Sequence, residues 1–307
     1  MKLSMLCLSL VLVLGACTKK NANKEVTSEL KGQIVVDGSS TVYPITEAVA
    51  EEFRRTYPDV RVTVGLSGTG GGFKKFYQGE IDITDASRPI KEEEKQKLKE
   101  NNIDYIELEV AYDGISIVVN HDNNWVTDIT TQELNQIWKS ESSVKTWKDV
   151  RSTWPNRPIK LYGPGPDSGT FDYFTEVINH KGKSCRSDYT KSEDDNVLVT
   201  GIKGDKDSLG YFGFAYYKEN AAGLKVIPVN AGKGQITPTE ETIRTGTYAP
   251  LSRPLYVYVS KKSLTRPEVL AFLKFYLSNV SSFISQVGYI GLPPEKYQEQ
   301  LTKLEQK

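Results

Sequence analysis

The sequence predicts an α/β fold arranged in two lobes, and three observations support this prediction. From residue 32 onward, short β-branched runs alternate with segments whose apolar residues recur at helical spacing. The chain has 307 residues, which is more than one hydrophobic core usually serves. Three Ser-, Thr- and Gly-rich segments each stand between a strand-like run and a helix-like run: residues 37–44, 65–73 and 163–171.

The first 16 residues have the composition of a secretory signal peptide. Lys2 is the only charge before an apolar run, residues 3–13, which is short for a membrane span. The run ends in Leu-Gly-Ala-Cys, which resembles a bacterial lipobox with cleavage before Cys17 and acylation of its sulfur, for example with palmitate. A plain secretory signal with a chance cysteine is the alternative. Residues 17–31 are polar and Lys-rich, so we expect a flexible tether.

The first strand–helix units are predicted within residues 32–102. Residues 34–36 are an apolar run, and residues 45–57 carry apolar side chains at helical spacing until Pro58 ends the helix. The other predicted elements of this part are strands over residues 60–64 and 81–84, a helix that starts within 73–77 and a charged surface helix over 91–102.

The same alternation continues to the end of the chain. Thr130 or Thr131 is expected to cap a helix over 130–138, with Glu133 completing a capping box. Further predictions are strands over residues 115–119 and 255–259, an amphipathic helix over 267–277 and the start of another helix over 281–287. Tryptophan also stacks on sugars, but we interpret the large aromatics as core packing: Trp125, Trp138, Trp147, Trp154 and the run 211–217.

Composition argues against several classes of protein. Lys and Arg together equal Asp and Glu at 39 each, so no basic stripe for nucleic acid is expected. Cys7 and Cys17 belong to the targeting segment, which leaves Cys185 without a partner for an intrachain disulfide. The only histidines, His121 and His180, are not a pair at metal-ligand spacing, so we expect neither a metal nor a cofactor.

The three Ser/Thr/Gly segments have the character of anion sites. A helix start leaves backbone N–H groups unpaired and carries the positive end of the helix dipole. Serine and threonine hydroxyls can cap the helix or donate to a ligand. Three such segments in one chain indicate a clamp around an oxyanion, which is a binding site and not a catalytic one.

Nucleotide and hydrolase motifs do not fit these segments. In a P-loop, a lysine directly follows the last glycine, and here Phe73 stands in that position. Phe73 also stands where the Gly-x-Gly-x-x-Gly pattern needs its last glycine. A serine hydrolase needs a histidine base held by a carboxylate, and no Gly-x-Ser-x-Gly elbow is present. We therefore expect no enzymatic activity.

A fourth segment, DITDASRP at residues 82–89, follows a predicted strand. Arg88 is expected to bind an oxyanion through its planar fork, with Ser87 as a donor. Carboxylates near the site suggest selectivity, because phosphate keeps a proton that a carboxylate can accept, whereas sulfate would be repelled. The candidate acceptors are Asp85, Asp167 and Asp172.

Read together, five segments resemble the phosphate-binding lipoproteins of bacterial phosphate ABC importers, the PstS family. They are GSSTVYPITEAVAEEF, GLSGTGGGFKKF, GEIDITDASRPI, LYGPGPDSGTFDYF and LGYFGFAYY, and the likeness runs from about residue 32 to 293. The resemblance implies a type II periplasmic-binding fold: two α/β lobes that close on the ligand by hinge bending. Lobe 1 would comprise residues 32–112 and 253–307, and lobe 2 residues 113–252.

The resemblance also assigns the site, residue by residue. It implies phosphate contacts from Ser39, Ser40, Thr41, Ser67, Thr69, Ser168, Gly169 and Thr170. Better-known members have an arginine where this chain has Pro164, and an aspartate where it has Ser87. We therefore expect Arg88 to supply the cation, and Asp85 or Asp167 to accept the phosphate proton.

The resemblance further implies a monomeric, lipid-anchored, extracytoplasmic protein whose partners are inorganic phosphate and the permease subunits of an importer. Three alternatives stay open at this point. The first is the same fold with another tetrahedral oxyanion, such as sulfate or tungstate. The others are a phosphate-releasing hydrolase, and a sensor or adhesin that borrows the fold.

Overall fold

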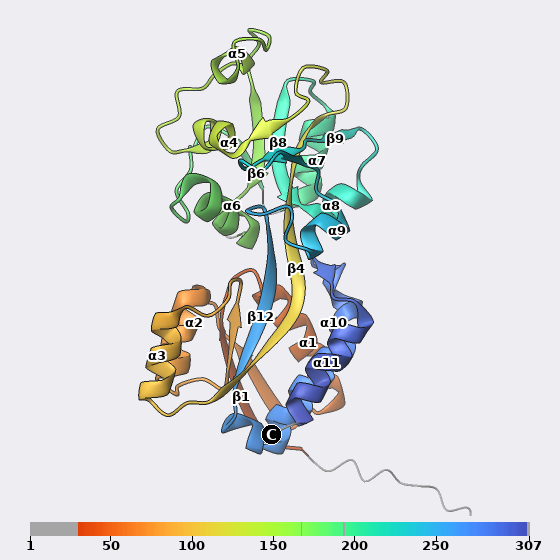
Figure 1. The fold of residues 1–307 in the computed structure, drawn as a ribbon. Helices are drawn as coiled ribbons and strands as arrows, with labels where there is room; N and C mark the ends of the chain where they lie inside the picture. Colours follow the sequence, from red (N-terminus) through yellow and green to blue (C-terminus); the bar gives the residue numbers. More distant parts are fainter. Residues whose placement is uncertain (1–29, 167, 193, 306–307) are drawn as a thin grey trace, which may run out of the picture.

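Two lobes of mixed α/β structure are joined by two long strands, β4 (Tyr105–Asn120) and β12 (Ser252–Ser260), in a computed structural model (Figure 1). The structure describes residues 30–166, 168–192 and 194–305. The predicted signal peptide and Cys17 lie outside the described residues. Within the described part of the chain, no helix has both the length and the apolar character needed to cross a membrane.

Lobe 1, the lower body in Figure 1, holds both ends of the described chain. Its elements besides the long strands are β1 (Gly32–Gly38), α1 (Tyr43–Thr56), β2 (Val60–Val64), α2 (Gly68–Tyr77), β3 (Ile83–Ala86), α3 (Glu92–Glu100), a 3₁₀ turn (Ser263–Thr265), α10 (Pro267–Ile284), β13 (Ile290–Gly291) and α11 (Pro294–Glu305).

Lobe 2 is the upper body. It contains β5 (Ile129–Thr130), α4 (Thr131–Trp138), α5 (Trp147–Val150), β6 (Lys160–Pro164), α6 (Gly169–Asn179), β7 (Thr190–Ser192), α7 (Asp195–Lys203), β8 (Ser208–Gly213), α8 (Phe214–Glu219), β9 (Leu224–Val226), β10 (Val229–Asn230), β11 (Gln235–Ile236) and α9 (Glu240–Arg244).

The main sheet passes from one lobe to the other through β4, in the order β2-β1-β3-β12-β4-β8-β6-β7. Strands β1, β2 and β3 are mutually parallel in lobe 1, and β6 is parallel to β7 and β8 in lobe 2. In α/β sheets, ligands bind at the carboxyl ends of such strands. The segments that follow β1, β2, β3 and β6 are therefore placed where a ligand is expected.

Most predicted elements are confirmed but differ in extent; the strand predicted over 115–119, for example, is part of β4, which begins at Tyr105. Helix α2 begins at Gly68 and not within 73–77, so the glycines form its first turns. A Cβ on Gly72 would lie 2.6 Å from the Cα of Gly38, so only glycine lets α2 pack this closely on β1. The prediction of a separate helix that starts within 281–287 was wrong. Helix α10 continues to Ile284, and Val280 and Ile284 extend its buried face.

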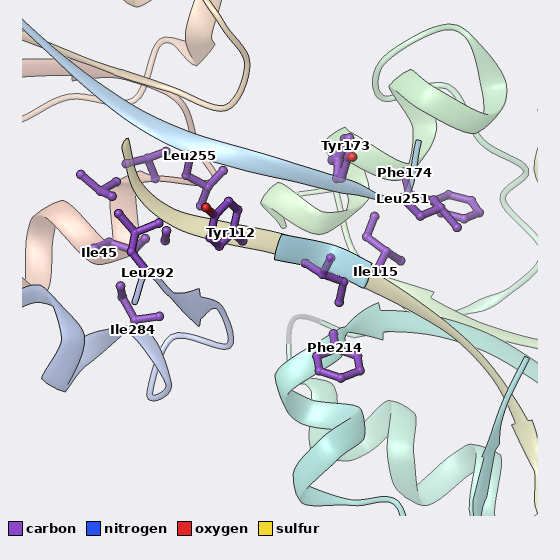
Figure 2. Close-up of a cluster of buried hydrophobic side chains, with 14 of the residues drawn as sticks. Ile45, Tyr112, Ile115, Tyr173, Phe174, Phe214, Leu251, Leu255, Ile284 and Leu292 are labelled. Carbon is purple, nitrogen blue, oxygen red and sulfur yellow. The ribbon is translucent and has the colours of Figure 1, made fainter. Parts of the chain in front are cut away.

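The aromatic residues pack in the core, as predicted, although Trp125, Tyr216 and Tyr217 are only partly buried. Thr130 caps α4, and its side chain accepts from the backbone N–H of Glu133. One cluster of buried side chains continues from lobe 1 to lobe 2 along β4 and β12 (Figure 2). Its labelled members are Ile45, Ile284, Leu292, Tyr112, Leu255, Ile115, Leu251, Tyr173, Phe174 and Phe214. The predicted lobe boundaries at 112/113 and 252/253 fall within β4 and β12 and stay predictions.

Candidate functional site

Segments 39–41 of lobe 1 and 168–172 of lobe 2 lie in direct contact. The Thr41 hydroxyl is 3.5 Å from the Gly169 carbonyl oxygen, and the Ser40 hydroxyl donates to Asp172 over 3.2 Å. A Cβ added at Gly169 would lie 2.8 Å from the Cα of Thr41. The lobes are therefore closed on each other here, and the contact leaves no room for a side chain at position 169.

Each side of this contact is the start of a helix. Helix α6 begins at Gly169 with Ser168 as its N-cap, and the Ser168 hydroxyl accepts from the Thr170 N–H over 3.2 Å. Helix α1 begins two residues after Thr41, whose N–H donates to the Ser39 hydroxyl over 3.2 Å. Two positive helix ends thus meet between the lobes, which favours a negatively charged ligand. Asp167 lies outside the described residues.

The Ser/Thr/Gly segment over residues 65–73 reaches the site through Thr69. Its hydroxyl lies 3.1 Å from the Ser87 hydroxyl and accepts from the Ser87 N–H over 3.1 Å. Ser67 is directed elsewhere, because its N–H and its hydroxyl donate to Asp37 over 3.0 and 2.5 Å. Burial would raise the pKa of Asp37, but hydrogen bonds from Lys75 and Ser67 outweigh burial and hold that pKa below its ordinary value.

The cation at this site is Arg253, at the start of β12, which the sequence reasoning missed. Its guanidinium donates to the Thr41 hydroxyl over 2.8 Å and to the Ser87 carbonyl over 3.3 Å. The ring of Tyr173, from α6, lies 3.5 Å from the guanidinium carbon. From β12, Arg253 therefore touches residues at the α1 start, just after β3 and in lobe 2.

Asp113 holds Arg253 in place from the neighbouring strand. The two residues are paired in the antiparallel register of β4 and β12, and the Arg253 Nε lies 3.3 Å from the Asp113 carboxylate. Asp113 has no exposed side-chain surface. Burial raises the pKa of Asp113, and Arg253 opposes this change only in part. No residue near Arg253 in the sequence signals this role, because Asp113 is 140 positions away and is brought beside it only by the pairing of β12 with β4.

Arg88 is not brought to the other predicted site residues. Its two terminal nitrogens donate to both oxygens of Glu94 over 2.9 and 2.7 Å, and its guanidinium lies over the ring of Phe73. The hydrogen bond with Glu94 raises the pKa of Arg88. The planar fork on which the prediction for Arg88 depended is therefore occupied by a carboxylate on α3.

The two described carboxylates that we weighed as proton acceptors differ in position. Asp85 is fully buried beneath α1 and has no surface in the contact between the lobes. Asp172 lies in that contact, where one oxygen accepts from Ser40 and the other is buried without a hydrogen-bond partner among the described residues. Burial raises the pKa of Asp172, while Lys183 and Ser40 act in the opposite direction. Asp172 is therefore the better placed of the two.

A hollow of about 740 Å³ lies away from this contact, at the base of lobe 1, between Asp82, Ser260 and Arg266. The candidate site is recognised by its converging polar groups.

Comparison with known proteins agrees with this geometry. Residues 23–280 match the family model of the PBP superfamily domain. The Phosphate-binding protein PstS of Staphylococcus saprophyticus is 41% identical over 296 residues, which cover 96% of this chain and 90% of that protein. The chain belongs to the PstS family of phosphate-binding proteins. The predicted fold class, a type II periplasmic-binding-protein fold, is confirmed with it.

Other relatives of this PstS-family chain show similar coverage. Protein SphX of Synechocystis sp. is 46% identical over 291 residues, which cover 94% of this chain and 84% of that protein. A crystal structure described as a possible phosphate binding protein from Planctomyces limnophilus is 50% identical with a TM-score of 0.88, covering 90% of this chain and 99% of that one. A putative phosphate ABC transporter substrate-binding protein with bound phosphate, from Clostridium perfringens, is 25% identical with a TM-score of 0.57, covering 85% and 100%.

Proposed function

We propose that this protein captures inorganic phosphate between its lobes and delivers it to the permease of an ABC importer. The observation that carries the proposal is the meeting of two helix starts, one from each lobe, beside the buried Arg253. PstS-family membership supports phosphate as the anion. A ligand bound to both helix starts would hold the lobes together, and hinge bending would release it.

The proposed ligand contacts keep most of the predicted set. Thr41, Ser40, Ser39, Thr69, Ser87, Ser168, Gly169 and Thr170 supply hydroxyl and backbone donors, with Ser67 as a support for the α2 start. We propose Arg253 as the cation in place of Arg88. Hydrogen bonds to charged groups contribute roughly 1.5–3 kcal/mol each. Micromolar affinity needs about 8 kcal/mol, so a few such donors suffice without net positive charge.

We propose binding without catalysis. His180 is the residue that ends α6, at the far end of that helix from Gly169. His121 follows the end of β4 in lobe 2 and is exposed beside Asp122. Both histidines are therefore far from the place where a hydrolase would need its base.

Asp172 is proposed as the carboxylate that accepts the phosphate proton and excludes sulfate. Titration calorimetry on residues 30–307, stripped of bound ligand, is expected to show phosphate binding at least about a hundredfold tighter than sulfate or tungstate. Asp172→Asn should reduce this preference, because an amide can donate to either anion. Equal phosphate and sulfate affinities in the unaltered protein would remove the basis of the proposal.

We propose that the protein is a monomer held on the outer face of the membrane by acylated Cys17. We also propose that the lobe boundaries lie at 112/113 and 252/253. In cells, Cys17→Ser is expected to move the protein from the membrane fraction to the soluble extracytoplasmic fraction, because a serine hydroxyl gives no thioether anchor. Fractionation with immunoblotting measures this change. Retention of the variant on membranes would contradict the lipid anchor.

A further inference from the structure

Asp85 is a buried carboxyl group that the proposed phosphate contacts do not use. It lies within β3, where neighbouring side chains alternate between the two faces of the sheet. Ala86 packs with Phe73 and Phe76 under α2, so Asp85 points to the other face, toward α1 and α10. Neither of its carboxyl oxygens has a hydrogen-bond partner in the described parts of the chain.

The groups that act on Asp85 come from every element packed against it. Thr46 of α1 and Tyr276 of α10 are both buried, and their hydroxyls lie 3.2 Å apart. The charged neighbour is Asp37 of β1, and the strand partner on β12 is Val257. Burial raises the pKa of Asp85 to about 8, the charge of Asp37 raises it as well, and Thr46 opposes both. Its surroundings therefore favour the neutral carboxyl over the ionised one.

Asp85 lies directly behind residues 39–41 of lobe 1, which are proposed to contact the anion. Its carbonyl oxygen accepts from the Ser39 N–H over 2.9 Å, and Gly38 is its partner in the parallel register of β1 and β3. Thr46 is the fourth residue of α1, the helix whose start faces Gly169. A change of charge on Asp85 is thus felt where the anion would bind, through the backbone it supports and through space in a dry interior.

We propose that Asp85 couples anion binding to proton uptake: the site binds its anion with the Asp85 carboxyl neutral and loses affinity when that carboxyl ionises. The reason is repulsion, because an ionised Asp85 would add an unpaired negative charge behind a negatively charged ligand. Linkage is reciprocal, so a bound anion must also hold the proton on Asp85 more firmly. This inference rests on the proposed phosphate site and adds a regulation by external pH.

The same carboxyl makes folding stability depend on pH. The unfolded chain loses this proton near the ordinary pKa of about 3.9, whereas the folded protein keeps it to about pH 8. The folded state is therefore favoured by this group at low pH, and that contribution is lost as pH rises between these values. The free energy of unfolding of Asp85→Asn, measured relative to that of the unaltered protein, should therefore be higher at pH 8 than at pH 4.

The test is phosphate titration calorimetry from pH 6 to 9 on the unaltered protein, Asp85→Asn and Asp104→Asn, an exposed carboxylate of the same lobe. Comparing variants at each pH cancels the ionisation of phosphate itself. Between pH 7 and 9, the unaltered protein and Asp104→Asn should lose affinity on the order of tenfold relative to Asp85→Asn. Titrations near pH 8 in two buffers with different ionisation heats should show proton uptake that Asp85→Asn lacks.

A second variant keeps the inference testable if Asp85→Asn folds poorly. Thr46→Val removes the hydroxyl that favours the ionised carboxyl, so its loss of affinity should begin at higher pH. Parallel pH profiles of the unaltered protein and Asp85→Asn, or an unshifted profile of Thr46→Val, would overturn the coupling. Absence of phosphate binding at every pH would instead contradict the proposed function.

Discussion

Replacing Arg253 with glutamine is expected to weaken phosphate binding by at least about a hundredfold. Arg253 is the cation that touches both Thr41 and Ser87, and Asp113 aims it from the adjacent strand. Removing one partner of a buried charge pair costs about 3–5 kcal/mol, part of it from the charge left behind. Titration calorimetry measures the loss of affinity, and thermal unfolding followed by circular dichroism reports the fold.

Arg88→Gln is the matched control for this prediction. Because the Arg88 guanidinium is already bound to both oxygens of Glu94, its removal should change phosphate affinity by less than about threefold. A second control is the pair Arg253→Gln with Asp113→Asn, which should recover stability without recovering affinity. If Arg88→Gln weakens phosphate binding more than Arg253→Gln does, Arg88 and not Arg253 is the cation of the site.

Gly169→Ala is expected to weaken phosphate binding about tenfold or more while leaving the fold intact. The added methyl group would lie 2.8 Å from the Cα and the hydroxyl oxygen of Thr41, so the lobes could not close to the distance in this structure. Gly169 is the first residue of α6, where alanine is a good helix former. Calorimetry gives the affinity, and small-angle X-ray scattering with and without phosphate reports closure.

Gly70→Ala is the control for steric effects. Gly70 lies in α2, on another of the Ser/Thr/Gly segments, but a Cβ there would meet no atom within 4 Å. This variant should bind phosphate as the unaltered protein does and unfold at the same or a slightly higher temperature. If both glycine variants bind normally, the contact between Thr41 and Gly169 is not part of the closed, liganded form.

Local features of this chain could be predicted from the sequence, and features built across strands could not. The helices after the three Ser/Thr/Gly segments follow from short-range signals, a strand, a Ser- or Gly-rich turn and then helical spacing, although the glycines hid the first turns of α2. Arg253 reaches the site only because β12 pairs with β4 in a register that places Asp113 beside it. Nothing within a few residues of Arg253 encodes that register.

The predictions for Arg88 and Asp85 show the same limit, because they placed at the site two residues that the structure directs elsewhere. Both stand in one segment after the strand predicted over residues 81–84, so the sequence suggested that both faced the ligand. Glu94, six residues after Arg88, lies in the first turn of the next helix and binds the Arg88 guanidinium. Every residue of β3 is buried, so no alternation of apolar and polar residues reveals the face toward which Asp85 points.

The place of Arg253 on a connecting strand has a kinetic consequence. On the proposed hinge, a group near the pivot travels little when the lobes part, whereas Gly169, out on α6, swings away from Thr41. The open protein would therefore still present the guanidinium of Arg253, held by Asp113, to passing anions, and screening by salt would slow the first encounter. The subsequent shutting of the lobes brings Asp172 to Ser40 as well as Gly169 to Thr41, so its rate would also respond to ionic strength through the charge of Asp172.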